Sequence, residues 1–296
     1  MQFSPSHYLG AGLLYSMNIE RKRRIEGFIA LLLSSFAALA GLFWLVFILG
    51  DVIIHGIGAL NLNLFLHDPA PAGVAGGGLR HAFVGQLMIT IFATLIGVPV
   101  GVLGGTFLAE YARRTGFARV ISVLADIIVS VPSIVVGTFI YALLVRPLGH
   151  FSGWAGAVAL SIIMIPVVLR TTEDMLSMVP WTLREAAFAL GAPYYKVIVQ
   201  IVYRGAATGI LTGILLSIAR VAGETAPLLF TSFNNNFFSW DMNRPIASLT
   251  VTIFQYAMGP YEDWHQQAWA AAFIVTLFIL ALTLLGRFIL KWRFKQ

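Results

Sequence analysis

Two charged side chains, Arg220 and Glu224, lie inside the apolar run GILTGILLSIARVAGETAPLLF of residues 209–230. A charge near the centre of a bilayer costs at least ~2.5–3.5 kcal/mol. Arginine keeps its proton even when it is buried, so a partner or a ligand must neutralise it. Glu224 follows at the four-residue spacing that places two side chains on one face of a helix. A guanidinium in this position can bind an oxyanion through two parallel hydrogen bonds.

This pair has two interpretations. In the first, it is a structural ion pair that locks two helices together. In the second, Arg220 leaves Glu224 for a passing oxyanion and returns afterwards, and the neighbouring hydroxyl of Thr225 offers a further hydrogen bond. Two apolar residues often stabilise a protein as well as a buried ion pair does, which favours the second interpretation. The geometry of arginine suits phosphate, sulfate and molybdate alike.

The rest of the chain is unusually apolar. Of its 296 residues, 58% are hydrophobic and 11% are charged, whereas soluble domains carry about 25% charged residues. The apolar residues form long unbroken runs, which are typical of membrane helices and not of a β-barrel. The chain has no cysteine, which excludes disulfides and cysteine-ligated metals. We therefore expect an all-α membrane protein with about six transmembrane helices. These spans are predicted at residues 27–54, 83–110, 119–145, 153–172, 205–231 and 267–290.

The distribution of lysine and arginine predicts the orientation of these spans. Basic residues precede the first span, fill the loops after the second and fourth spans, and end the chain. The opposite loops hold only Arg80, Arg146 and Arg244. The positive-inside rule therefore places both termini in the cytoplasm. The predicted organisation is a cytoplasmic segment 1–26, a transmembrane domain 27–290 with a cytoplasmic loop 173–204 and periplasmic loops 55–82, 146–152 and 232–266, and a cytoplasmic tail 291–296.

Three regions outside the spans carry further expectations. Residues 1–20 have mixed composition, and we expect them to be poorly ordered. In the loop 55–82, the stretch DPAPAGVAGGGLRH contains proline and glycine that preclude a helix. The loop 232–266 is partly amphipathic and contains the aromatic stretch FNNNFFSWDM. It either lies on the membrane surface or forms a docking surface for an external partner.

Several polar residues lie within the predicted spans. Asp126 needs a partner, and we expect a contact with another helix. Arg170, at the end of the fourth span, is predicted to be an anchor at the cytoplasmic interface. Pro132 predicts a kink in the third span, where Ser130 and Ser133 either line a pathway or satisfy the broken backbone. The second span carries small residues that suit close helix packing, namely Gly97, Gly101, Gly104 and Gly105.

The cytoplasmic stretch VPWTLREAAFALGAPYYKVIVQIVYRG, residues 179–205, predicts a short helix between two prolines. Thr182 and Glu185 have the spacing of a capping box, with threonine as the N-cap. Gly191 is placed for the left-handed residue that ends a helix. A helix near 183–190 would be about 12 Å long. It is marginal in isolation, so it must pack either on its own membrane domain or in a groove of a partner.

The segment EAAFALGAPYYKVIVQI resembles the EAA loop of ABC-transporter permeases. Two longer segments, FSGWAGAVALSIIMIPVVLRTTEDMLSMVPWTLREAAFALGAP and GILTGILLSIARVAGETAPLLFT, are similar to the PstA-type permeases of bacterial phosphate importers. The similarity runs from about residue 25 to the C-terminus. Tyr203 and Arg204 stand where the EAA pattern usually has Leu-Pro. The EAA pattern itself falls on Glu185, Ala186, Ala187, Gly191 and Ile201.

This resemblance implies the type I ABC importer permease fold and a non-catalytic subunit of the bacterial inner membrane that forms half of a phosphate pathway. The implied partners are a PstC-like permease, two copies of a PstB-like ATPase that would hold ATP and Mg, and a periplasmic PstS-like phosphate-binding protein. Lipid would surround the spans, and no cofactor, metal or nucleic acid is expected on this chain. The pathway residues would be Arg220, Glu224, Thr225, Ser130 and Ser133. The coupling residues would be Arg184, Glu185, Ala186, Ala187, Phe188, Leu190 and Gly191.

Other functions remain open at this stage. A permease for sulfate or molybdate fits the same residues. In an ion-coupled secondary carrier, Glu224 would be the proton site, but such carriers commonly contain internal repeats, and the two halves of this sequence are not similar. A membrane scaffold without a transport role leaves Arg220 and Glu224 unexplained. The chain has no Walker-type sequence, so any ATP would be hydrolysed by another subunit.

Overall fold

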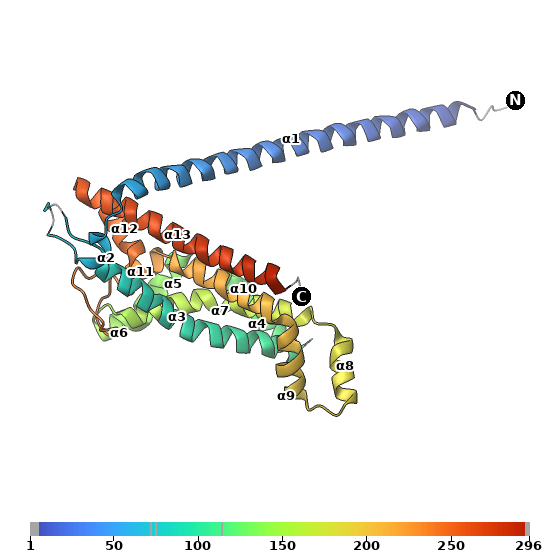
Figure 1. The fold of residues 1–296 in the computed structure, drawn as a ribbon. Helices are drawn as coiled ribbons and strands as arrows, with labels where there is room; N and C mark the ends of the chain where they lie inside the picture. The colour runs from blue at the N-terminus through green and yellow to red at the C-terminus, as the bar shows by residue number, and fades with distance from the viewer. Residues whose placement is uncertain (1–5, 72, 75, 114, 294–296) are drawn as a thin grey trace. The chain divides into compact units, whose positions relative to one another are not determined.

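The structure of the chain is a computed structural model that describes residues 6–71, 73–74, 76–113 and 115–293, with side chains between residues 23 and 288. The outer parts of the two predicted terminal segments, 1–5 and 294–296, lie outside the described residues. The regular elements of the described part are all helices (Figure 1). Five of them are long and apolar enough to cross a membrane, and a bent pair of helices can form a sixth span. The predicted fold class is therefore confirmed.

The chain divides into two compact units, residues 1–54 and 55–296. The first unit consists of most of helix α1 (Ser6–Ala59). Helix α1 begins at Ser6, within the segment 1–20, and the expectation that this segment is poorly ordered stays a prediction. No proline interrupts the stretch 6–59, so the backbone can continue the helix from the basic cluster into the first span.

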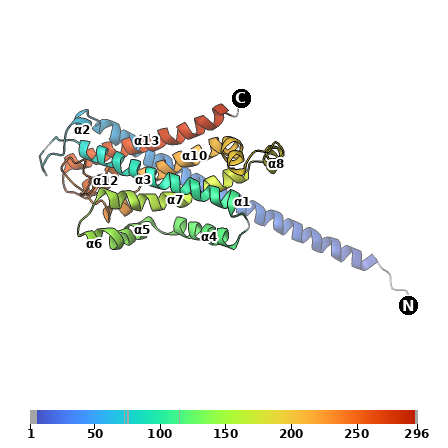
Figure 2. The same cartoon turned by 90° about the horizontal axis from the view of Figure 1, so that it is seen from below.

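The second unit is a bundle of helices, some of which continue into π-helical segments, with two longer irregular connections at 67–79 and 230–248 (Figures 1 and 2). Helix α8 lies at one end of this bundle, while α2, α6 and α12 lie at the opposite end, and both views agree on this. The elements of the unit after α1 are α2 (Asn63–Leu66), α3 (Arg80–Thr106), η1 (Phe107–Tyr111), α4 (Gly116–Ser130), α5 (Ser133–Ile140), η2 (Tyr141–Val145), α6 (Arg146–Leu148), α7 (Gly153–Ser177), α8 (Trp181–Ala189), α9 (Tyr194–Val197), η3 (Ile198–Val202), α10 (Tyr203–Ala222), α11 (Ala226–Leu229), α12 (Leu249–Ala257) and α13 (Glu262–Arg293).

The centre of the bundle is the contact between α3 and α7, and it depends on glycine. A Cβ added at Gly101 would lie 2.7 Å from Cβ of Val168, and one added at Gly97 would lie 3.0 Å from the sulfur of Met164. Gly104 and Gly105 of the same seam face Leu169 of α7 in the same way. Small residues let two backbones approach closely where lipid supplies no hydrophobic driving force. The packing role predicted for these glycines is confirmed.

Two predicted spans are not continuous helices. The third span, predicted at 119–145, breaks at Pro132 into α4 and α5, which meet at 102°. The kink expected from Pro132 is therefore a full change of direction, because proline lacks the N–H that would continue the helix. The fifth span, predicted at 205–231, runs instead from Tyr194 to Ala222, so it begins within the predicted cytoplasmic loop 173–204. The predicted external loop 232–266 contains α12, which packs against α3 and α13 and has buried residues on several sides.

The glycine-rich stretch before α3 behaves as expected. Among its described residues, no helix forms between Asp68 and Leu79. Gly76 and Gly77 have φ angles of 97° and 79°, in the left-handed region that favours glycine. Arg80 then begins α3 and pairs with Asp68 at 2.7 Å, which closes this loop.

Candidate functional site

Helix α10 ends inside the apolar run that carries Arg220 and Glu224. Its last helical residue is Ala222, and α11 begins only at Ala226. The amide of Gly223 bonds the carbonyl of Arg220 at 3.1 Å, which tightens the last turn before the helix stops. Pro227 is in the first turn of α11, where its missing N–H would have no helical partner anyway. Glycine and proline together therefore break the span.

The break changes the geometry of the charged pair. Nε of Arg220 lies 3.9 Å from Oε1 of Glu224, and the two side chains are 45% and 17% exposed. The two residues do not share one face of a continuous helix, because Glu224 comes after the helix end. A separation of 3.9 Å is too long for a hydrogen bond between the two side chains. The guanidinium is therefore held weakly and can exchange its partner.

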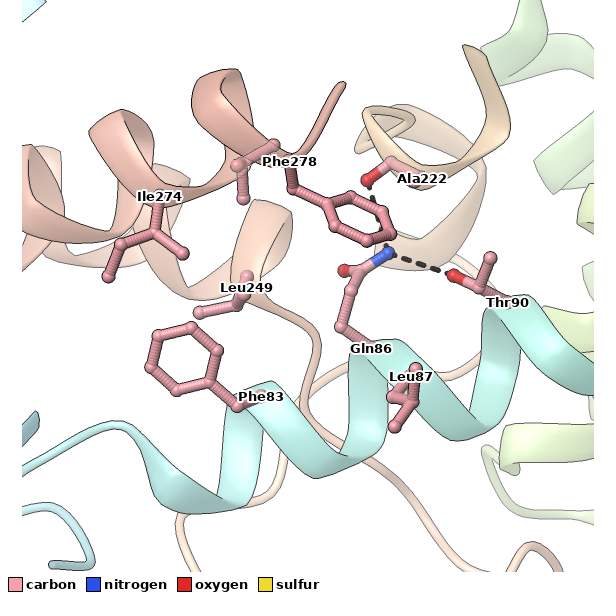
Figure 3. Close-up of a pocket in the computed structure, with 9 residues that line it drawn as sticks. Phe83, Gln86, Leu87, Thr90, Ala222, Leu249, Ile274 and Phe278 are labelled. Carbon is pink, nitrogen blue, oxygen red and sulfur yellow. Dashed lines mark hydrogen bonds between the residues drawn. The ribbon is translucent and has the colours of Figure 1, made fainter. Parts of the chain in front are cut away.

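Two side chains from other helices hold the broken backbone. Nε2 of Gln86, on α3, donates to the carbonyl of Ala222 at 3.2 Å and to Oγ1 of Thr90 at 3.4 Å (Figure 3). The hydroxyl of Thr250, on α12, donates to the carbonyl of Glu224 at 2.9 Å. These bonds replace hydrogen bonds that a continuous helix would have made. Our reading of the sequence missed both residues, although a single glutamine in an apolar span was a signal for Gln86.

A cavity of about 270 Å³ lies beside this break. Figure 3 shows Phe83, Leu249, Ile274 and Phe278 around it, with the amide of Gln86 at one side. The amide nitrogen of Gln86 must face Ala222, because the carbonyl oxygen of Ala222 can only accept a hydrogen bond. The amide oxygen of Gln86 is buried and has no hydrogen-bond partner in the described part of the chain. Since no charged side chain of the described residues lines this cavity, it is not suited to an oxyanion.

The remaining predicted pathway residues occupy the two breaks. Thr225 is the residue before α11, and its carbonyl accepts a hydrogen bond from the amide of Leu228 at 3.1 Å. The hydroxyl of Ser130 donates to the carbonyl of Ile127 at 2.7 Å. Ser133 begins α5 directly after Pro132. Among these three side chains, only the hydroxyl of Ser130 makes a hydrogen bond within the described part of the chain, and a role of the three residues in a pathway stays a prediction.

Arg170 joins α7 to α4. Its Nε donates to Oδ1 of Asp126 at 2.9 Å, its second terminal nitrogen bonds Oδ2 of the same carboxylate, and its Nη1 bonds Glu173 at 3.1 Å. The helix contact predicted for Asp126 is thus confirmed. The guanidinium of Arg170 thus binds two carboxylates within the chain, and its role as an anchor at the cytoplasmic interface stays a prediction.

The predicted short helix exists as α8 (Trp181–Ala189). The capping box is wrong, because the residue before the helix is Pro180 and no side chain caps it. The other end is as predicted: Gly191 has φ 78°. The amide of Gly191 donates to the carbonyl of Phe188 at 2.9 Å, and the amide of Ala192 donates to the carbonyl of Ala187 at 3.1 Å. This is the Schellman pattern, which ends a helix in a defined direction.

Arg184 fixes α8 to the bundle. Its guanidinium pairs with Glu110 of η1 at 2.5 Å, and the two side chains are 2% and 1% exposed. It also donates to the carbonyl of Val179 at 2.6 Å and to that of Leu176, in the last turn of α7, at 3.0 Å. Tyr194 donates to the carbonyl of Glu110 at 2.8 Å. These bonds explain why a nine-residue helix is stable here.

The faces of α8 are therefore unequal. Arg184 and Ala187, both predicted to contact a partner, are buried within this chain. The other predicted coupling residues lie on the exposed side, and Leu190 is 89% exposed. Phe188 is less exposed, because its ring stacks on that of Tyr194 at 5.8 Å. The exposed predicted residues are Glu185, Ala186, Phe188, Leu190 and Gly191.

Comparison with known proteins gives a consistent result. Residues 97–294 match the family model of binding-protein-dependent transport system inner membrane components. The chain is 50% identical over 267 residues to the phosphate transport system permease protein PstA of Yersinia pestis, covering 90% of each chain. It is 51% identical over 265 residues to the PstA of Pasteurella multocida, covering 90% of this chain and 94% of the relative. The probable PstA of Methanocaldococcus jannaschii is 39% identical over 216 residues, or 73% of this chain and 76% of that one.

Among solved structures, an inward-facing form of the MetNI methionine ABC transporter has a similar fold. The TM-score is 0.55 at 19% identity, over 71% of this chain and 91% of the other. This likeness shows the permease fold of type I ABC importers. The chain therefore belongs to the family of binding-protein-dependent transport system inner membrane components and, within it, to the PstA permeases.

Proposed function

We propose that this multi-pass membrane protein is the permease subunit of an ATP-driven importer of inorganic phosphate and forms half of its pathway. The observation that carries the proposal is the weakly held guanidinium of Arg220 at the end of a broken span. The PstA relatives indicate phosphate as the substrate. We place the protein in the bacterial inner membrane with both termini in the cytoplasm, as the basic residues predict.

Arg220 acts on the substrate by exchanging partners. Phosphate carries close to two negative charges and accepts two parallel hydrogen bonds from the planar guanidinium. Glu224 compensates the arginine when no phosphate is present, and its distance of 3.9 Å makes that contact easy to break. Gln86 and Thr250 hold the backbone on both sides of Gly223, so the exchange moves side chains and leaves the break in place.

ATP hydrolysis takes place on another subunit and reaches this chain through α8. The buried side of α8 is fixed by Arg184, while apolar Leu190 is almost fully exposed on the other side. A rigid helix with an exposed apolar end suits a groove in a PstB-like ATPase. Two copies of such an ATPase would bind ATP and Mg. One copy would contact this chain, and the other would contact a PstC-like permease. Leu190 and Phe188 are the apolar contacts.

The opposite end of the bundle receives the binding protein. Arg80 pairs with Asp68, and its guanidinium carbon lies 4.6 Å from the centre of the Phe238 ring, which joins the two outer loops. Phe237 and Trp240 are 82% and 66% exposed beside it. Exposed aromatic side chains are typical anchors of a protein interface. We therefore assign the loops 55–82 and 232–266 to contact with a PstS-like protein.

Reconstitution tests this function. The complex of this chain with a PstC-like permease and a PstB-like ATPase is placed in lipid vesicles with the binding protein. Phosphate is expected to stimulate ATP hydrolysis and to enter the vesicles, whereas sulfate and molybdate are expected to do neither. Stimulation by sulfate or molybdate alone would identify a permease for another oxyanion. Phosphate uptake driven by a proton gradient without ATP would identify an ion-coupled carrier.

A further inference from the structure

One end of helix α3 is joined to α8, the helix proposed to contact the ATPase. Glu110 lies in η1, which continues α3, and accepts hydrogen bonds from Nη2 and Nε of Arg184 at 2.5 and 3.3 Å. Both side chains are buried, so separating them would leave an unpaired charge away from water. A displacement of α8 therefore carries η1 with it. Arg184 also donates a hydrogen bond to the carbonyl of Leu176, so the end of α7 is connected to α8 and η1 as well.

The same helix is joined to the proposed anion site near its other end. Gln86 of α3 is 8% exposed and donates to the carbonyl of Ala222, two residues after Arg220 (Figure 3). Gln86 precedes Glu110 by 24 residues, or about 36 Å at 1.5 Å per residue. One continuous rod of helix thus spans the distance between α8 and the break that follows Arg220.

The packing of α3 makes it stiff along this length. Pro99 lies within the helix and removes one backbone hydrogen bond. On either side of it, Gly97 and Gly101 are in close contact with Met164 and Val168 of α7. These contacts hold the two helices as one body at the position where a proline would otherwise let α3 bend.

We propose that α3 is the mechanical link between α8 and the anion site. Movement of α8 passes through Glu110 and Arg184 into α3, and Gln86 passes it to the break that carries Arg220 and Glu224. Glu110, Arg184 and Gln86 are positioning residues in this proposal, since each acts through its bond to another part of the chain. The inference rests on the proposed function, because it requires α8 to contact the ATPase and Arg220 to bind phosphate.

The movement can be measured separately from transport. The chain has no cysteine, so Gly223→Cys adds its only thiol. Gly223 is exposed, and the nearest atom to an added Cβ is the end of Ile279 at 3.2 Å, which can shift. The alkylation rate of this thiol is measured in the reconstituted complex with and without ATP, after cysteines of the other subunits are removed. In the otherwise unchanged chain, ATP is expected to alter the rate.

Variants at the two ends of α3 are compared in this background. In Arg184→Gln, Glu110→Gln and Gln86→Met, we expect ATP hydrolysis to continue and the alkylation rate to stop responding to ATP. Phosphate imported per ATP should fall by about 5–150-fold, the range typical of coupling between sites. Arg119→Gln removes an exposed charge and Leu87→Met alters a neighbour of Gln86, and both controls should behave as the unchanged chain does.

The results separate the alternatives. If variants of Glu110, Arg184 and Gln86 assemble and retain the ATP-dependent alkylation, α3 is not the link, and any loss of thermal stability reflects only a structural role. If the charge variants fail to assemble, Gln86→Met decides the matter, since it leaves the ion pair intact. A complex that imports no phosphate, but whose ATP-dependent alkylation is lost in the three variants, overturns the proposed function and supports the connection from α8 to the break after Arg220.

Discussion

Replacing Arg220 should separate assembly from transport. The ion pair with Glu224 is long, at 3.9 Å, and this distance does not allow a hydrogen bond, so the fold should not depend on it. Arg220→Gln is therefore expected to give an assembled complex. A hydrogen bond to a charged group contributes ~1.5–3 kcal/mol, and two of them are lost for phosphate in the pathway. Import should then fall by roughly 10²–10⁴-fold at 1.4 kcal/mol per factor of ten.

Arg220→Lys refines the same prediction. Lysine keeps the positive charge but lacks the planar fork that binds an oxyanion through two parallel bonds. We expect it to recover little of the import. If charge alone mattered, lysine would restore most of it.

The assay measures labelled phosphate uptake and ATP hydrolysis in the same vesicles, with thermal unfolding of the complex as a check on assembly. Arg119→Gln is the matched control, because Arg119 is an exposed arginine on α4. Hydrolysis without uptake is the expected behaviour of Arg220→Gln, and the control should show both.

The double change Arg220→Gln with Glu224→Gln provides the refutation. It removes both charges, so a purely structural pair would be replaced by two neutral amides of similar size. Near-normal import by this double variant would show that Arg220 does not act on phosphate. An assembled but inactive double variant supports the anion site.

Four further predictions follow from other contacts. Leu190→Asp should abolish either transport coupled to ATP hydrolysis or assembly with the ATPase. The thermal stability of the isolated chain should change by less than ~0.5 kcal/mol, since the side chain is 89% exposed. Phe188→Asp should have the same effect on transport or assembly with some loss of stability, because its ring stacks on that of Tyr194. Gly101→Val should destabilise the chain by ~1–3 kcal/mol in thermal unfolding, because its Cβ would meet Val168 at 2.7 Å, whereas Gly116→Ala, with no atom within 4 Å, should not. Arg170→Gln should lower the unfolding temperature more than Asp126→Asn, since only the former leaves two carboxylates without their shared partner. A thiol in Asn235→Cys should react with membrane-impermeant reagents from the periplasmic side, and reaction only from the cytoplasmic side would invert the topology.

Features that depend on neighbouring residues could be predicted from the sequence. Long apolar runs indicated the spans, because a backbone in lipid must satisfy its hydrogen bonds within a helix. The end of α8 at Gly191 was predictable, since a left-handed residue followed by proline stops a helix whatever surrounds it. The glycine seam of α3 was predictable as a packing surface, although its partner α7 was not. The similarity to phosphate permeases indicated the family from the motifs themselves.

Only the tertiary structure decided which polar residues belong together. The partner of Arg184 is Glu110, 74 residues away, and no local pattern distinguishes this buried arginine from an exposed one on the same short helix. The capping box failed because Pro180 starts the helix earlier, and a proline before a helix competes with a threonine two residues on. The span of α10 could end at Ala222 because Gln86 and Thr250, distant in sequence, bind the carbonyls that the break exposes. Hydropathy counts apolar residues along a run, and so it cannot register side chains from other helices that make a break in that run stable.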